Sequence, residues 1–321
     1  MSHGRQYQIG SFHVTDLSRM TSTRYRAHQI ADIILHEEMD IAVMQGVRDA
    51  DALNPILTCL GRSWDRAWVL SRPKSWILDT DHDPRGTGYA FLWDARRFRL
   101  LQTGLQSGEK KEAEPELYSR YRTEKSKDLK TILRDPAYGR FTASGRNGCS
   151  FELRLICTRI MYNGIDEQRD WRYWPMRQNE FEVLARSILP QAEDAVYGAQ
   201  MPAYTLLLGD YNLSLRREWT KKPYLEIPPE GFLEEEKQIV TVQDQLTTLK
   251  KPKKGSAEPT VGYLHNHDHA TYNQKRLHAL QPSCRRVDVM NISYYSTYFG
   301  NYDRYREEIS GHLPIVITIS P

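Results

Sequence analysis

The chain has 321 residues, of which 40% are hydrophobic and 26% charged, and its net charge is +3 at pH 7. This composition supports a hydrophobic core in one large domain or two small ones, and the charge is too small to indicate nucleic-acid binding by itself. No run approaches the roughly 18 apolar residues that a membrane-spanning helix needs, so no membrane partner is expected.

The cysteine content gives no sign of a disulfide framework or a zinc site. The chain has four cysteines without C-x-x-C spacing, which are Cys59, Cys149, Cys157 and Cys284. The first residues are polar and contain no apolar signal core. We therefore expect a reducing, cytoplasmic setting.

The first third of the chain alternates strand and helix patterns. Strict alternation predicts an opening strand at residues 7–14, and an apolar stripe at helical spacing predicts an amphipathic helix at 24–38. The next patterns predict, in order, a strand at 41–44, a helix at 51–60, strands at 68–70 and 76–78, a turn at 79–88 and a strand at 89–93.

Residues 106–138 change in character. They are rich in Lys, Glu and Arg and contain few branched apolar residues. This pattern predicts a solvated surface insertion at about 107–138, and the alternative is an arm that binds a protein partner. The basic stretch 250–254 predicts a surface loop, with a phosphate contact as its alternative, and 216–222 is a second basic stretch.

The rest of the chain returns to strand and helix patterns. These predict, in order, a strand at 151–156, a helix at 174–189 and strands at 206–208, 287–292 and 313–319. No internal repeat and no linker is visible, so we expect one domain over residues 1–321. Strands alternating with helices indicate a layered α/β fold.

Two motifs follow predicted strands and carry candidate functional residues. The apolar run 206–208 ends at Gly209, after which Asp210 and Asn212 stand two residues apart. A carboxylate and a carboxamide at the end of a strand can hold a phosphate and a water. Near the C-terminus, Arg286-Val287-Asp288 precedes Ser310-Gly311-His312-Leu313-Pro314.

Read in chain order, these and other segments resemble the endonuclease/exonuclease/phosphatase (DNase I-like) superfamily. The matching segments are 9–14, 40–47 (D-I-x-x-L-Q-E-V), 88–94, 155–164 (N-T-H-L), 177–185, 208–212 (G-D-F-N), 271–272 (T-Y), 286–288 (R-I-D) and 310–314 (S-D-H-L-P). The resemblance covers nearly the whole chain. It implies an α/β fold, a four-layer α/β/β/α sandwich of two mixed sheets flanked by helices.

The resemblance also implies a chemistry, the metal-assisted hydrolysis of a phosphate ester. On this basis His312 matches the family's base and Asp288 matches the aspartate that orients it. Asp210 and Asn212 match the residues that position the nucleophile and the phosphate. These four residues are the predicted catalytic set.

Four positions depart from the family pattern. His13 replaces an asparagine that supports the metal, Gly46 a metal-binding glutamate, Arg159 a histidine that contacts phosphate, and Gly311 a second carboxylate near the metal. Neither glycine can ligate an ion, and magnesium requires hard oxygen ligands, so we predict no metal ligands and no cofactor. Arg159, together with Asn212 and His312, is predicted to bind phosphate, because an arginine can hold phosphate without a metal.

These departures lead to two hypotheses. The first is a catalytically impaired pseudoenzyme that acts as a binding or assembly subunit and retains phosphate or nucleic-acid binding. The alternative is an active phosphodiesterase or nuclease with a rebuilt active site, using magnesium or manganese. A protein partner would bind through 107–138.

Additional histidines could serve such a rebuilt site. His13 adds a nitrogen donor, which suits zinc or manganese better than magnesium. His265, His267 and His269 alternate, so on a strand they would share one face, and with Asp268 nearby they could bind a transition metal. The alternative is an ordinary polar loop.

Overall fold

The computed structural model describes residues 6–72, 86–103, 113–118, 132–143, 151–160, 170–197, 202–213, 239–242, 245–250, 262–273, 283–290 and 301–320. Within these ranges, the side chains of 170–174, 239–242 and 283–289 are outside the description.

The first of two mixed sheets has six strands. Its order is β12 (Ser283–Val289), β13 (Ile315–Ser320), β1 (Tyr7–Leu17), β2 (Ile41–Val47), β4 (Thr87–Asp94) and β3 (Trp64–Ser71). β1 and β2 run parallel, and the other neighbours pair antiparallel. Every residue of β2 is buried, as expected for a strand covered on both faces.

The second sheet has seven strands. Its order is β10 (Ile239–Val242), β11 (Asp268–Asn273), β9 (Ala203–Asp210), β8 (Glu152–Arg159), β7 (Ala137–Ala143) and β5 (Phe98–Leu101), and β6 (Glu116–Leu117) also pairs with β7. β8 and β9 run parallel. Each sheet thus contributes one parallel pair of strands.

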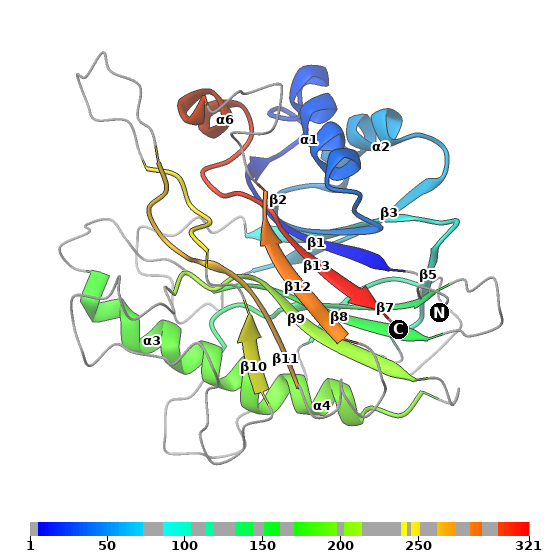
Figure 1. Cartoon of the computed structure of the whole chain (residues 1–321), viewed down its shortest axis with the longest axis vertical. Coiled ribbons are helices and arrows are strands. Elements are labelled where there is room, and N and C mark those ends of the chain that lie inside the picture. Colours follow the sequence, from blue (N-terminus) through cyan, green and yellow to red (C-terminus); the bar gives the residue numbers. More distant parts are fainter. Residues whose placement is uncertain are drawn as a thin grey trace.

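Helices cover the outer faces of the two sheets, as Figure 1 shows. The six-stranded sheet carries α1 (Arg24–His36), α2 (Asn54–Leu60) and α6 (Tyr302–Glu308). The other sheet carries α3 (Asp170–Val183), a π-helical turn (Leu184–Ile188) and α4 (Leu189–Asp194). Three buried apolar clusters correspond to the three contacts between these four layers. The predicted α/β/β/α sandwich is therefore confirmed.

The local sequence determines where helix α1 begins and which of its faces is buried. Thr23 is the N-cap, and its hydroxyl accepts a hydrogen bond from the backbone N–H of Arg26 at 3.2 Å. Of the predicted apolar stripe, Ile30, Ile33 and Ile34 are buried against the sheet, whereas Tyr25, His28 and Leu35 are exposed.

Several element boundaries differ from the sequence prediction. The helix predicted at 51–60 is a 3-10 helix (Ala50–Leu53) followed by α2. Residues 137–138, assigned to the charged insertion, are the first two residues of β7 and are buried. The predicted strand at 76–78 and most of the predicted insertion lie outside the described residues. Among the helices that the structure describes, none is long and apolar enough to cross a membrane.

Candidate functional site

The two sheets meet at a group of polar residues contributed by strand ends. His13 lies in β1, and Asp210 is the last residue of β9 in the other sheet. Asp268 begins β11 and pairs directly with Asp210 across the two antiparallel strands. His312 lies between α6 and β13 and forms a backbone bridge with Thr248.

His312 and Asp268 form a hydrogen-bonded pair. The distance from His312 Nδ1 to Asp268 Oδ2 is 2.9 Å, and the two side chains are 16% and 1% exposed. Ser310 fixes the backbone of this segment, because its hydroxyl accepts from the His312 N–H at 3.0 Å and donates to the His13 carbonyl at 2.6 Å. Burial acts to lower the pKa of His312, but the negative charges of Asp268 and Asp210 outweigh it and raise that pKa.

The partner of His312 differs from the one that the sequence predicts. Asp288 was expected to orient His312, whereas the structure places Asp268 on its Nδ1 atom. The backbone of Asp288 lies in β12 opposite Val316, and its side chain lies outside the description. A role for Asp288 therefore stays a prediction. From the sequence, Asp268 was a possible metal ligand beside the three alternating histidines, and its pairing with His312 was not predicted.

Asp210 is the most heavily contacted carboxylate of the site. It is 1% exposed, and its Oδ2 atom lies 3.1 Å from His13 Nδ1 and 3.9 Å from Arg159 Nε. Burial alone would raise its pKa, but the positive charge on His312 and the contact with His13 lower that pKa far below its ordinary value. Asp210 is consequently ionised at neutral pH.

Asn212 shapes the turn that holds Asp210. Its φ is +48°, and its backbone N–H donates to Asp210 Oδ1 at 2.9 Å. Its side-chain amide donates to the carbonyl of Ile160 at 2.7 Å and to Asp210 Oδ2 at 3.2 Å. Both amide hydrogens are thus used within the turn. Asn212 positions Asp210 in this arrangement, whereas the sequence predicted that it would also contact phosphate.

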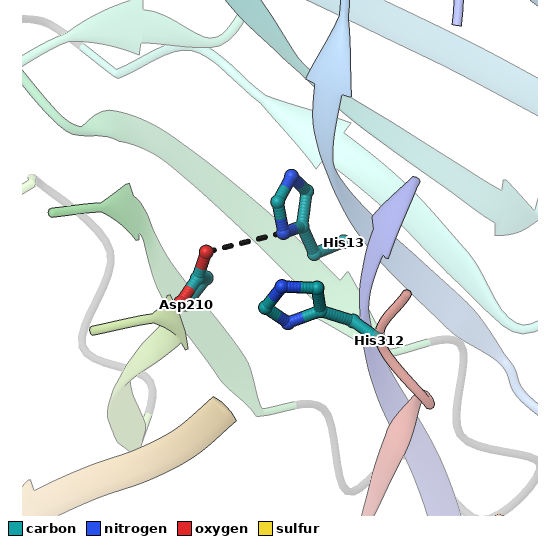
Figure 2. Close-up of side chains that lie close together, drawn as sticks. All are labelled: His13, Asp210 and His312. Atoms are coloured by element: carbon teal, nitrogen blue, oxygen red, sulfur yellow. Dashed lines mark ion pairs between the residues drawn. The ribbon is translucent and has the colours of Figure 1, made fainter. Parts of the chain in front are cut away.

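His13 is buried beside both Asp210 and His312. Figure 2 shows the two imidazole rings and the Asp210 carboxylate facing one another. The ring centroids of His13 and His312 are 4.3 Å apart, and one ligand atom from each of the three residues lies within 4.8 Å of the others. Burial, reinforced by the positive charges of Arg159 and His312, lowers the pKa of His13 to about 3, so its ring is neutral. From the sequence, His13 was a departure from the family pattern and a possible nitrogen donor to zinc or manganese.

Arg159 is the accessible cation of the site. It is the last residue of β8 and pairs with Asp210 at the end of the neighbouring strand β9. Its side chain is 32% exposed. No partner for this guanidinium other than Asp210 lies among the described residues. Its partly exposed guanidinium could therefore contact an anion from solvent.

Gly46 occupies a β-bulge in β2. Its φ is +88°, and the pairing of β2 with β4 shifts register between Gln45 and Val47. A Cβ atom at this position would fall far inside van der Waals contact of the Val14 carbonyl oxygen and 3.2 Å from His13 Cδ2. The backbone at this position thus excludes a side chain of any kind.

The residues present do not fit the magnesium site that the resemblance implies. Gly46 offers no side-chain oxygen, and neither does Gly311. The groups near Asp210 are two imidazoles, a guanidinium and the Asp268 carboxylate, whose Oδ2 atom is already hydrogen-bonded to His312, whereas magnesium prefers an octahedral set of oxygens.

The other three histidines do not converge on one point. His265 and His267 stack with centroids 4.8 Å apart, and His267 lies 6.4 Å from the ring of His312. The Nε2 atom of His269 instead lies 3.0 Å from the carbonyl of Leu213. Within the described part of the chain, none of the three belongs to a group of ligands close enough to hold a metal ion.

Comparisons with known proteins identify the fold. No family model matches the chain, and no curated protein matches it.

Several solved structures match the chain in fold. An endonuclease/exonuclease/phosphatase family protein from Bacteroides thetaiotaomicron is 13% identical, with 98% of this chain and 95% of that chain covered and a TM-score of 0.56. D. rerio TDP2 in complex with a single-strand DNA product is 14% identical, with 98% and 99% covered and a TM-score of 0.53. Truncated Caenorhabditis elegans TDP2 is 13% identical, with 98% of each chain covered and a TM-score of 0.51.

Proposed function

We propose that this chain, which has the endonuclease/exonuclease/phosphatase (DNase I-like) fold, binds a phosphate ester in a pocket that no longer supports magnesium-dependent hydrolysis. The observation that carries the proposal is the backbone of Gly46. Its positive φ and the nearby Val14 carbonyl exclude a carboxylate where the family pattern has one. The protein is then a binding subunit with a disabled metal site.

The opposite side of the pocket retains groups that bind anions. The Arg159 guanidinium is accessible, and the ring of His312 is held by Asp268 in an orientation that directs Nε2 away from that carboxylate. An arginine contacts phosphate oxygens through two parallel hydrogen bonds, which are stronger than neutral ones. Arg159 and His312 are therefore the proposed phosphate contacts, and Asn212 supports them by positioning Asp210.

A nucleic-acid strand is the phosphate ester that we favour. One solved structure with this fold, D. rerio TDP2, holds a single-strand DNA product. The basic stretch 216–222 follows Asn212 closely in sequence and would supply further phosphate contacts, although it lies outside the described residues. Binding should accordingly weaken as salt is added.

Titration of a fluorescent single-stranded oligonucleotide tests the binding. We expect Arg159→Ala to weaken the affinity by about tenfold or more, because it removes a charged hydrogen bond of ~1.5–3 kcal/mol. Arg62→Ala is the matched control, since Arg62 is exposed in the turn before β3 and should leave the affinity unchanged. Equal binding by the wild type and Arg159→Ala would remove this pocket from the proposal.

A hydrolysis assay tests the loss of catalysis. We expect the wild-type protein with magnesium to cleave DNA, RNA and a generic phosphodiester no faster than Asp210→Ala and His312→Ala proteins do. Magnesium-dependent cleavage that both substitutions abolish would overturn the proposal.

An active phosphodiesterase with a rebuilt site is the second candidate. It is favoured by the His312–Asp268 pair, which keeps the geometry of an oriented base, and by His13, which adds a ligand beside Asp210. Turnover that requires zinc or manganese and is lost on His13→Gln would establish this candidate instead.

A further inference from the structure

We propose that His13, Asp210 and His312 form a binding site for a divalent transition metal, with zinc as the best match. The proposal goes beyond phosphate binding and does not depend on it. It makes His13 a direct metal ligand, where the family pattern has an asparagine that supports the metal. The first hypothesis from the sequence had no metal ligands, and a nitrogen donor from His13 belonged to its alternative.

The three side chains come from separate parts of the fold and converge. Figure 2 shows His13 reaching from β1, Asp210 from the end of β9 and His312 from the segment before β13. Their ligand atoms lie within 4.8 Å of one another. Atoms bound tetrahedrally at zinc distances are roughly 3.4 Å apart, so small ring rotations would bring all three into contact with one ion.

The chemistry of the donors matches zinc rather than magnesium. Two imidazole nitrogens and one carboxylate oxygen form a three-ligand set that zinc accepts, with the fourth position left for water or a substrate oxygen. Magnesium dehydrates reluctantly and prefers oxygen ligands. Gly46 and Gly311 leave too few carboxylates for it.

The surroundings of His312 favour the same assignment. Its Nδ1 atom is hydrogen-bonded to Asp268 at 2.9 Å, so Nε2 is the atom that can face an ion. A histidine ligand that is fixed by a carboxylate in this way is typical of zinc sites, because the carboxylate sets the tautomer and increases the basicity of the ring.

His13 supplies an independent observation. Its side chain is 5% exposed, and neither ring nitrogen has a hydrogen-bond partner among the described residues. The 3.1 Å contact of Nδ1 with Asp210 does not meet hydrogen-bond geometry. A buried polar atom without a hydrogen bond is destabilising, and a metal ion would provide a partner for one of the two ring nitrogens.

Arg159 is compatible with such an ion. Its Nε atom lies 3.9 Å from Asp210 Oδ2, beyond direct hydrogen-bond distance, and the side chain is partly exposed. It can therefore turn toward solvent or toward an anion bound at the fourth metal position.

The test uses the full chain after treatment with EDTA, with the metal ion alone as the probe. Calorimetric titration should show one zinc ion bound per chain, and no magnesium binding at the same concentrations. Cobalt, as a spectroscopic substitute, should give the intense visible bands of a tetrahedral site. His13→Gln should lose zinc, while Asp268→Asn should weaken it by roughly 10–100-fold, the usual effect of removing a carboxylate behind a histidine ligand.

His28→Gln is the matched control, because His28 is an exposed histidine on α1 that pairs with Asp32 and should not affect zinc binding. Circular dichroism verifies that each variant is folded. Absence of zinc binding by the folded wild type, or undiminished binding by both His13→Gln and Asp268→Asn, would overturn the proposal. Oligonucleotide binding by the metal-free protein is measured separately, so a failed zinc site remains distinguishable from a failed phosphate pocket.

Discussion

At the residue scale, the two glycines that replace family carboxylates have different backbones. Gly46 has a positive φ and lies against the Val14 carbonyl. A Cβ atom on Gly311 would meet only the Arg306 Nη1 atom, at 3.4 Å. Carboxylates at the two positions must therefore be tested separately, because only position 311 has room for a side chain.

This difference predicts that substitutions at the two positions have unequal effects on the free energy of unfolding. Gly46→Glu should destabilise the protein by about 2 kcal/mol or more, because it combines a strained φ with a steric clash. Gly311→Asp should change the stability by no more than ~0.5 kcal/mol, since the new carboxylate points toward Arg306. Urea unfolding of the two variants measures both effects. A Gly46→Glu protein as stable as the wild type would mean that the bulge in β2 can rearrange.

The sequence located the site but not its pairing. Asp210, Asn212 and His312 were identified from motifs at strand ends, and Asp210 and Asn212 do form one turn beside His312. The pairing of Asp268 with His312 was missed because it depends on β11 pairing with β9 in a register that places Asp268 opposite Asp210. No local pattern in the sequence encodes that register.

At the element scale, a buried ion-pair network joins two strands and a helix of the seven-stranded sheet. Glu152 at the start of β8 accepts from Arg140 of β7 at 2.8 and 2.9 Å and from Arg154 at 2.7 Å. Arg154 also donates to the carbonyl of Ala192 in α4 at 2.6 Å. Breaking one member of such a network leaves buried charges without a partner.

Glu152→Gln should therefore destabilise the protein by about 3–5 kcal/mol, measured by chemical unfolding at pH 7. Glu308→Gln is the matched control: Glu308 pairs with Arg304 on the surface of α6, and its loss should cost less than ~1 kcal/mol. Similar effects of the two substitutions would show that the buried network contributes little.

The Glu152 carboxylate makes the free energy of unfolding depend on pH. Burial acts to raise the pKa of Glu152, but the hydrogen bonds from Arg140 and Arg154 outweigh it and lower the pKa. A lowered pKa in the folded state adds stability that is fully present above the unfolded pKa of about 4.3 and is lost as the pH falls through the folded value. The destabilisation caused by Glu152→Gln should accordingly shrink below pH ~4.

Hydrophobic periodicity predicted the elements that bury a clear apolar face or run, and it missed a strand that also buries polar side chains. The α1 helix and the strands β1, β2, β4 and β9 coincide with their patterns, because each presents a clear apolar face or run. β7 was missed because it buries Arg140 and Thr142 between apolar neighbours. A strand that buries paired polar residues does not show the hydrophobic alternation by which strands are predicted.

At the scale of the whole molecule, the order of weak motifs predicted the architecture better than any single motif did. The three solved structures compared above share only 13–14% identity with the chain, so most positions differ in residue while the fold is the same. What persists is the spacing of apolar strands and the glycine and polar residues at their ends. Of the four departures from the family pattern, His13 and Arg159 both contact Asp210, Gly46 lies beside His13, and Gly311 directly precedes His312.

The contact between the two sheets predicts that the molecule unfolds as one cooperative unit. Phe141 of β7 lies between the sheets, with its ring centroid 5.8 Å from that of Phe91 and 5.4 Å from that of Trp93, both on β4 of the other sheet. Phe141→Ala should destabilise the protein by about 3–5 kcal/mol, because it removes a fully buried ring from this interface. Met20→Ala is the control, since Met20 is 90% exposed.

Tryptophan fluorescence and far-ultraviolet circular dichroism, followed in the same urea titration, measure whether the sheets unfold together. We expect both signals to shift to lower urea by the same amount in Phe141→Ala, because neither sheet can keep its inner face buried once the other is lost. A Phe141→Ala protein in which the two transitions separate would contradict this. One sheet with its covering helices would then be stable alone, and the interface between the sheets could open without unfolding the remainder of the chain.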